Sequence, residues 1–226
     1  MIGEIVAGDF RTASVFTEAG IDFCCGGKKT LGTACAEAGV DEEILVKKLA
    51  DIETSSGATH HFNEWDLSFL ADYIMNTHHK YVMKTMPEIK FYTQKIAGVH
   101  GERHHELAEI AHLFSKINTE LLQHLKNEEE VLFPAIKKIA ANEPGDSASV
   151  IISEITRMFG EHEFAGGAMD WINQISGHYM VPDDGCNTYR LTYQLLKQFE
   201  DDLHIHVHLE NNILFPKALK LAETVL

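Results

Sequence analysis

The sequence has few of the features that mark an exported, membrane-bound or nucleic-acid-binding protein. Its 226 residues include four cysteines, five prolines and 19 Lys and Arg, against 34 Asp and Glu. Scarce basic residues argue against nucleic-acid or anionic-membrane partners. No apolar run approaches the roughly 20 residues of a membrane span, and the N-terminus MIGEIVAGDF lacks a basic start and an apolar signal core. We therefore expect a cytoplasmic protein without a disulfide framework.

Two domains are predicted, and both are helical. Residues 1–57 contain short segments punctuated by glycines, typical of a small helical domain, and the polar stretch 54–61 is interpreted as a linker. The second domain, residues 63–226, shows helical periodicity throughout. It divides into four long amphipathic helices with short connections, at about 63–97, 102–141, 147–176 and 188–223. This pattern predicts an all-α fold with an antiparallel four-helix bundle.

One segment of the second domain occurs twice. Residues 124–134, HLKNEEEVLFP, return as residues 206–216, HVHLENNILFP. Each copy has His-x-x-x-Glu, a β-branched residue and Leu-Phe-Pro at the same spacing. Because residues four apart share a helix face, each copy presents an imidazole and a carboxylate together. The proline that ends each copy is expected to interrupt its helix just past this point.

These ionisable residues fall on the apolar seams of the predicted helices, which step by three and four residues. Helix 102–141 reads Ile110, Phe114, Ile117, Leu121, His124, Glu128, Val131, Ala135; helix 188–223 reads Leu196, Phe199, Leu203, His206, Glu210, Ile213; helix 147–176 reads Ile151, Ile155, Met158, His162, Ala165, Met169, Ile172. A single buried histidine can be satisfied within a core. Ionisable residues on three seams require a shared partner, because burying them costs several kcal/mol or more. A metal pair would supply it.

Helix 63–97 offers two adjacent candidates, His78 and His79. The series through His79 stays apolar, whereas the series through His78 ends in polar residues. We therefore expect His79 to point inward, although the two side chains are only about 100° apart around the helix.

The predicted ligand set contains four imidazoles and two carboxylates. Two histidines on each metal, with Glu128 and Glu210 bridging, would suit two iron ions. Zinc accepts the same donors but is usually held by four ligands at one centre, so a set of six nitrogen and oxygen donors favours iron or manganese. The complete set is His79, His124, Glu128, His162, His206 and Glu210.

These motifs resemble the hemerythrin-like fold, and more closely the repair-of-iron-centres proteins, a family of di-iron proteins that repair iron–sulfur clusters. In the second domain the resemblance rests on the two repeat copies, on Gly160-Glu-His-Glu163, and on His79 preceding Met86-Pro-Glu88. In the first it rests on Asp22-Phe-Cys-Cys-Gly-Gly-Lys28, similar to the small Cys-Cys-Gly-Gly domain that precedes the bundle in that family.

The resemblance implies a di-iron centre, expected to be oxo-bridged, and damaged iron–sulfur proteins as partners. The implied role is repair of clusters damaged by nitric oxide or peroxide, by donating iron. Reduction of nitric oxide at the irons is a second implied activity, which leaves open whether the protein is an enzyme. The alternative is a hemerythrin-like protein that binds or senses oxygen or nitric oxide without repair. The Cys-Cys-Gly-Gly domain favours repair, because a simple oxygen carrier has no need of it.

Four further residues receive predicted roles. Cys24 and Cys25 are interpreted as exposed thiols with thiolate character, because glycines and lysines adjoin them; the alternative is a buried apolar pair. Glu120 and Glu161 lie beside the seam, where they are either solvated or in contact with the metal ligands from outside. Because the linker is short, a homodimer is one way to bring the thiols of one chain to the bundle of another.

Overall fold

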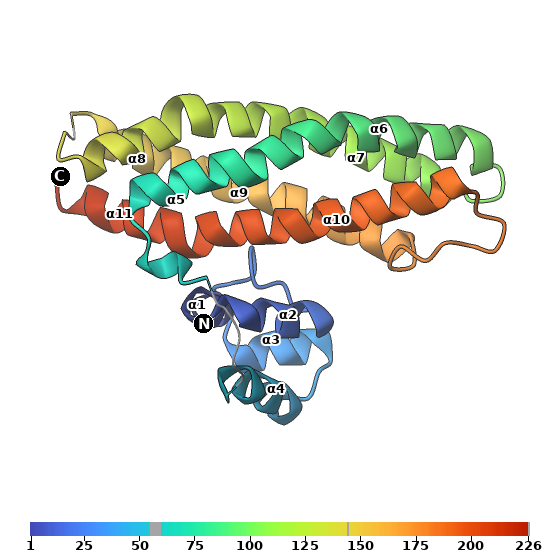
Figure 1. Ribbon diagram of the computed structural model, residues 1–226, viewed down its shortest axis with the longest axis horizontal. Helices are drawn as coiled ribbons and strands as arrows, with labels where there is room; N and C mark the ends of the chain where they lie inside the picture. The colour runs from blue at the N-terminus through green and yellow to red at the C-terminus, as the bar shows by residue number, and fades with distance from the viewer. Residues whose placement is uncertain (55–59, 144, 226) are drawn as a thin grey trace. The chain divides into compact units, whose positions relative to one another are not determined.

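The computed structural model describes residues 1–54, 60–143 and 145–225, and every regular element in these ranges is a helix (Figure 1). Part of the predicted linker, residues 55–59, lies outside the described residues. The elements of the N-terminal part are α1 (Ile2–Gly8), the short 3₁₀ turn η1 (Phe10–Thr12), α2 (Ala13–Glu18), α3 (Leu31–Ala38), α4 (Glu42–Thr54) and a second 3₁₀ turn η2 (Phe62–Glu64).

The four long helices predicted from periodicity are all present, but three of them are divided. Their segments are α5 (Leu67–Ile74), η3 (Met75–His79) and α6 (Lys80–His100); α7 (Glu106–Asn127), η4 (Glu128–Leu132) and α8 (Phe133–Ala140); the undivided α9 (Ser147–Ile175); and α10 (Asn187–Leu209), η5 (Glu210–Leu214) and α11 (Phe215–Glu223). None of the helices in the described ranges has the length and apolar character that crossing a membrane requires.

Each of the three interruptions is one turn of π-helix. In the repeated segments the N–H of Phe133 bonds to the carbonyl of Glu128, and the N–H of Phe215 bonds to that of Glu210. These i→i+5 bonds immediately precede the prolines, which have no N–H to offer. The interruption expected from the prolines is thus a wider turn that inserts one residue.

The inserted residue changes which side chains face the core. Val131, predicted to lie on the apolar seam, is 40% exposed, whereas Leu132 is fully buried. The prediction for Val131 is wrong because a strict three-and-four step assumes an unbroken α-helix. Ala135 is buried, so the seam resumes beyond the π-turn.

The chain divides into two compact units, which are described separately. The first comprises residues 1–72, 135–152 and 204–226, and the second comprises residues 73–134 and 153–203. The N-terminal helices of the first unit enclose their own apolar core, built from side chains that include Ile2, Val6, Phe16, Phe23, Cys35 and Leu45. Cys35 therefore packs in a core. The boundaries predicted at 57 and 63 remain a prediction.

In the second unit, α6 and α7 pack side by side (Figure 1). They run in opposite directions, because the short turn between them reverses the chain. The seam residues predicted for α7, α9 and α10 within this unit are buried, among them Ile110, Phe114, Ile155, Met158 and Phe199. At roughly 25 cal/mol per Å² of apolar surface removed from water, this burial is the main force that holds the helices together. It also keeps water from the ionisable residues on the same seams.

Candidate metal centre

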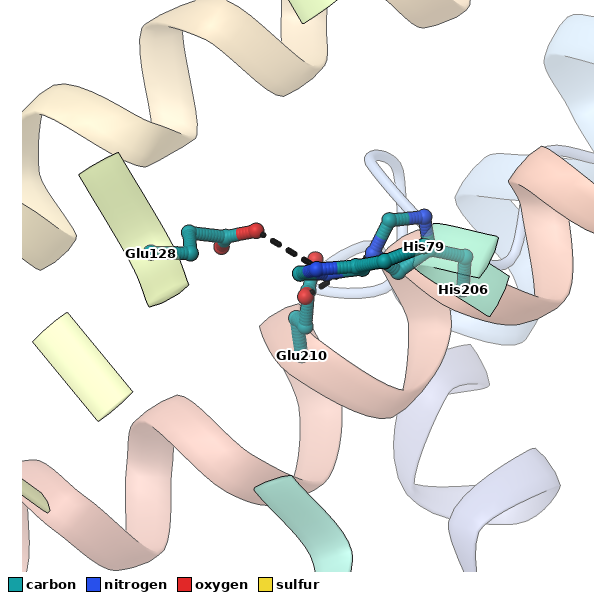
Figure 2. A group of neighbouring side chains, drawn as sticks. All are labelled: His79, Glu128, His206 and Glu210. Atoms are coloured by element: carbon teal, nitrogen blue, oxygen red, sulfur yellow. Dashed lines mark hydrogen bonds and ion pairs between the residues drawn. The ribbon is translucent and has the colours of Figure 1, made fainter. Parts of the chain in front are cut away.

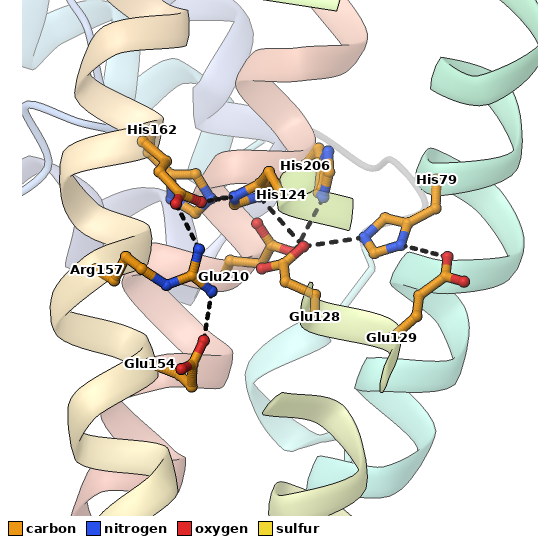
Figure 3. Close-up of polar contacts among 10 residues, drawn as sticks. His79, His124, Glu128, Glu129, Glu154, Arg157, His162, His206 and Glu210 are labelled. Carbon is orange, nitrogen blue, oxygen red and sulfur yellow. Dashed lines mark hydrogen bonds and ion pairs between the residues drawn. The ribbon is translucent and has the colours of Figure 1, made fainter. Parts of the chain in front are cut away.

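Four of the predicted ligands belong to the second unit and converge there (Figure 3). His79 Nε2 lies 3.4 Å from Glu128 Oε2, and His124 Nε2 lies 3.2 Å from the same oxygen. His162 Nε2 lies 3.2 Å from His124 Nε2. All four residues are at most 2% exposed. Two of the three π-turns supply residues of this cluster, since His79 ends η3 and Glu128 begins η4.

Carboxylates outside the cluster orient two of these imidazoles. Nδ1 of His79 lies 2.8 Å from Glu129 Oε1, and Nδ1 of His124 lies 2.7 Å from Glu161 Oε2. Arg157 donates to Glu161 over 2.6 Å. The hydrogen bond with His124 lowers the pKa of Glu161, and the Arg157 charge adds to this effect. A carboxylate accepts, so Nδ1 of each ring carries the proton and Nε2 turns a lone pair inward.

The remaining predicted ligands, His206 and Glu210, belong to the first unit. His206 Nε2 lies 3.0 Å from Glu210 Oε1, one helical turn away, and both residues are at most 1% exposed. Glu210 begins the π-turn η5, just as Glu128 begins η4 in the other repeat copy. The repeated sequence therefore has a repeated local structure.

Figure 2 labels His206 and Glu210, whose contact a dashed line marks. Within the second unit, the ligand atoms of His124, Glu128 and His162 lie within 4.8 Å of one another.

The donor chemistry of these groups fits a metal. With the protons of His79 and His124 on Nδ1, each Nε2 lone pair faces the Glu128 carboxylate at 3.4 and 3.2 Å. Acceptor atoms that converge in a buried place repel one another, and a cation between them turns this repulsion into coordination. Imidazole and carboxylate together suit iron, manganese or zinc.

Of the two glutamates predicted beside the seam, only Glu161 contacts a ligand. Glu120 is exposed, as the solvated alternative required. It precedes His124 by one turn, yet its side chain leaves the seam toward solvent.

The expected exposure of Cys24 is wrong. Its side chain is 4% exposed, and its pKa lies well above the ordinary value because the thiol bonds to Cys25, is buried and lies near Asp22. Cys25 is only partly buried. Asp22 shapes the loop: its Oδ1 accepts from the backbone N–H of Cys24 and Cys25, and its Oδ2 accepts from that of Gly26. The glycines serve this tight turn and do not open the loop to solvent.

Three side-chain contacts near the predicted ligands were missed from the sequence. Glu129 follows a predicted ligand directly, so in an unbroken α-helix it would point about 100° away from that ligand. The π-turn η4 begins at Glu128, and Glu129 contacts His79. Arg157 lies one turn before Glu161, a spacing that pattern alone makes common on solvated helices. Nδ1 of His78 lies 2.9 Å from Asp202 Oδ1, so this buried imidazole has a carboxylate partner of its own.

A further pair lies away from this cluster, in the second unit. Cys186, for which the sequence suggests no partner, has its Sγ 3.3 Å from Nε2 of His100. His100 is the last residue of α6 and is 5% exposed, whereas Cys186 is exposed.

Comparison with known proteins agrees with this geometry. Residues 70–218 match the hemerythrin HHE cation-binding domain, and residues 1–53 match ScdA_N, described as a domain of unknown function. The chain belongs to the hemerythrin-domain family of iron–sulfur cluster repair proteins. This membership confirms the hemerythrin-like, all-α bundle expected from the sequence.

The relatives extend over almost the whole chain. The iron–sulfur cluster repair protein YtfE of Yersinia pestis is 32% identical over 210 residues, which cover 93% of this chain and 92% of the relative. The iron–sulfur cluster repair protein ScdA of Staphylococcus epidermidis is 29% identical over 220 residues, covering 96% and 97%. ScdA of Staphylococcus haemolyticus is 30% identical over 217 residues, covering 96% of both chains.

Proposed function

We propose that this protein repairs damaged iron–sulfur clusters by donating iron held at a di-iron centre. The ligands would be His79, His124, Glu128, His162, His206 and Glu210, with both glutamates bridging the two ions. The observation that carries the proposal is the convergence of the buried residues His79, His124, Glu128 and His162 in the second unit. The repeat copy holds His206 and Glu210 in the same buried His-x-x-x-Glu arrangement within the first unit. Relatives whose names state iron–sulfur cluster repair support the role.

The residues around the centre suit an iron that is stored and then released. Two imidazoles are oriented by carboxylates, and one of these carboxylates, Glu129, is 42% exposed on its side chain. The bound ions would supply Lewis acidity and one-electron chemistry. The chain itself holds the protons of His79 and His124 at Nδ1, away from the metal side, and excludes water by burying every ligand.

Metal analysis tests the centre. Protein purified without oxygen should contain about two irons per chain, and its oxidised form should show the near-ultraviolet absorption of an oxo bridge. Glu128→Ala and Glu210→Ala should each lose iron and that absorption. One zinc and no iron would refute the centre, and a full, unchanged centre in both variants would refute the bridging assignment.

A repair assay tests the function. An iron–sulfur enzyme whose cluster has been damaged by nitric oxide should recover more activity with the iron-loaded protein than with an equal amount of free ferrous iron. Recovery no greater than with free iron would favour the alternative, a protein that binds or senses oxygen or nitric oxide.

Cys24 and Cys25 form the second part of the proposal: they accept iron, or present reducing equivalents to the di-iron pair, during repair. With Asp22 they offer three ligand atoms within 4.8 Å of one another. The Cys24–Cys25 loop needs no second chain to lie near the proposed ligand Glu210. Asn212, two residues beyond Glu210 in the same unit, donates to the Cys24 carbonyl. The variant Cys24→Ser/Cys25→Ser should keep its iron and lose repair activity. Undiminished repair would exclude the thiols from the mechanism.

A further inference from the structure

The two copies of the repeated segment differ where sequence equivalence would predict likeness. Position 126 is Lys in the first copy and its equivalent 208 is His; position 130 is Glu and its equivalent 212 is Asn. Lys126 and Glu130 have side chains at least 60% exposed and form an i,i+4 ion pair of 4.0 Å. His208 is fully buried and Asn212 is partly buried. The first copy therefore has a solvated pair at these positions, whereas in the second copy His208 and Asn212 pack against other parts of the chain.

Asn212 docks onto the loop that carries the two thiols. Its Nδ2 lies 3.2 Å from the carbonyl oxygen of Phe23 and 3.2 Å from that of Cys24. The same amide lies 3.1 Å from Nδ1 of His208. Since an amide nitrogen only donates, the two carbonyls are its acceptors. One side chain thus ties the π-turn η5 to the carbonyl groups on both sides of the Cys24 α-carbon.

Two glycines make room for this side chain. A Cβ atom added at Gly3 or at Gly27 would lie 2.3 Å from Asn212 Oδ1, well inside contact distance. The N–H of Gly3 also donates to the Gly27 carbonyl over 2.9 Å, which closes α1 onto the loop. The second glycine of Cys-Cys-Gly-Gly is thereby explained: it admits the Asn212 amide.

His208 completes the contact with its ring. The ring is fully buried and packs edge-on against Phe23, with centroids 5.5 Å apart. The side chain of His208 also hydrogen-bonds to the backbone of Phe23. A polar group buried in such a contact needs a partner of this kind.

We propose that Asn212 is a positioning residue that couples the Cys24–Cys25 loop to Glu210. Glu210 and Asn212 belong to the same five-residue π-turn, so a displacement of one alters the backbone that carries the other. Such coupling is reciprocal: metal held by Glu210 steadies the loop, and release of the loop weakens the hold on metal. The metal half of this inference rests on the proposed function, whereas the docking half does not.

The test uses the full-length chain with the isosteric variant Asn212→Asp, whose carboxylate cannot donate and repels the two carbonyls. The matched control is Glu130→Gln, a carboxylate–amide exchange at the equivalent exposed position of the other copy. Amide hydrogen exchange of residues 23–27 is measured on metal-free and iron-loaded protein. Release of ferrous iron to a chromogenic chelator is timed in parallel, and circular dichroism confirms folding; if Asn212→Asp does not fold, Asn212→Ala replaces it.

In the metal-free protein, Asn212→Asp should raise loop exchange by on the order of tenfold, the effect of losing a partly buried hydrogen-bond cluster. Iron loading should slow loop exchange in the wild type and in Glu130→Gln but not in Asn212→Asp, which should also release iron severalfold faster. Unchanged loop exchange in the variant would overturn the docking role. Raised exchange with wild-type iron release would overturn the coupling. Failure of the wild type to bind iron would overturn the proposed function and leave the metal-free comparison intact.

Discussion

At the scale of single residues, the histidines of the centre are set by neighbours that the sequence pattern does not reveal. Glu161 accepts a hydrogen bond from the Nδ1–H of His124 at 2.7 Å and another from Arg157 at 2.6 Å. A carboxylate in this place fixes the tautomer and the ring plane of a ligand imidazole. In the proposed centre, the charge on Glu161 would therefore act on the metal through His124, without contact with the ion.

Glu161→Gln should therefore weaken iron binding roughly tenfold or more, the usual effect of losing such a partner. The amide keeps the size of the side chain but loses the charge that His124 and Arg157 both need. Affinity is measured by competition with a ferrous chelator. Glu120→Gln is the matched control: it makes the same exchange one helical turn before His124, at a glutamate that is exposed. Equal losses in the two variants would contradict the role given to Glu161.

The thiols differ sharply in what can reach them. Cys24 and Cys35 are buried, Cys25 is partly buried, and Cys186 is exposed beside the imidazole of His100. Burial and the neighbouring groups raise the pKa of Cys24, which leaves little of the thiolate that reacts with electrophiles.

We expect iodoacetamide to alkylate Cys186 first, Cys25 second, and Cys24 and Cys35 last. Peptide mass mapping over a time course gives this order. His100→Gln should slow the reaction at Cys186 and leave Cys25 unchanged, since the His100 imidazole lies within hydrogen-bond distance of the Cys186 sulfur. Early modification of Cys24 in folded protein would show that its loop is open.

At the scale of elements, periodicity predicted the four long helices because each buries one apolar stripe over many turns. The ligand positions followed from the same stripe, since an ionisable residue there is conspicuous. The π-turns were beyond reach, because a Pro in a helix signals an interruption without specifying a wider turn. The contacts of Glu129 and the exposure of Val131 depend on that turn and were missed for this reason.

The register change at η4 has a measurable consequence for stability. Leu132 is fully buried and Val131 is 40% exposed, so Leu132→Ala should lower the free energy of unfolding by about 2–5 kcal/mol. Val131→Ala should change it by about 0.5 kcal/mol or less, as for other surface positions. Urea unfolding of metal-free protein compares the two. A larger loss of unfolding free energy for Val131→Ala than for Leu132→Ala would instead support the unbroken helix that the sequence suggested.

At the scale of the whole molecule, the proposed ligands are distant in sequence and come from both compact units, with His124 in the second and His206 in the first. A metal that binds the native but not the unfolded chain stabilises it by mass action, by about 2.7 kcal/mol at a free concentration 100 times the dissociation constant. Repulsion among the imidazole and carboxylate acceptors lowers the stability of the metal-free protein, so it adds to the stability difference between the metal-bound and metal-free forms.

Iron loading should therefore raise the melting temperature of the wild-type chain, and removal by a chelator should reverse the rise. His124→Ala and His206→Ala should each abolish this shift if ligands from both units bind one centre. His78→Ala is the control: it removes a buried imidazole and its contact with the partly exposed Asp202, so it should lower the melting temperature of the metal-free protein while retaining the increase on loading. A shift that survives His206→Ala but not His124→Ala would place the metal in the second unit alone, and the first unit would then contribute no ligand through this histidine.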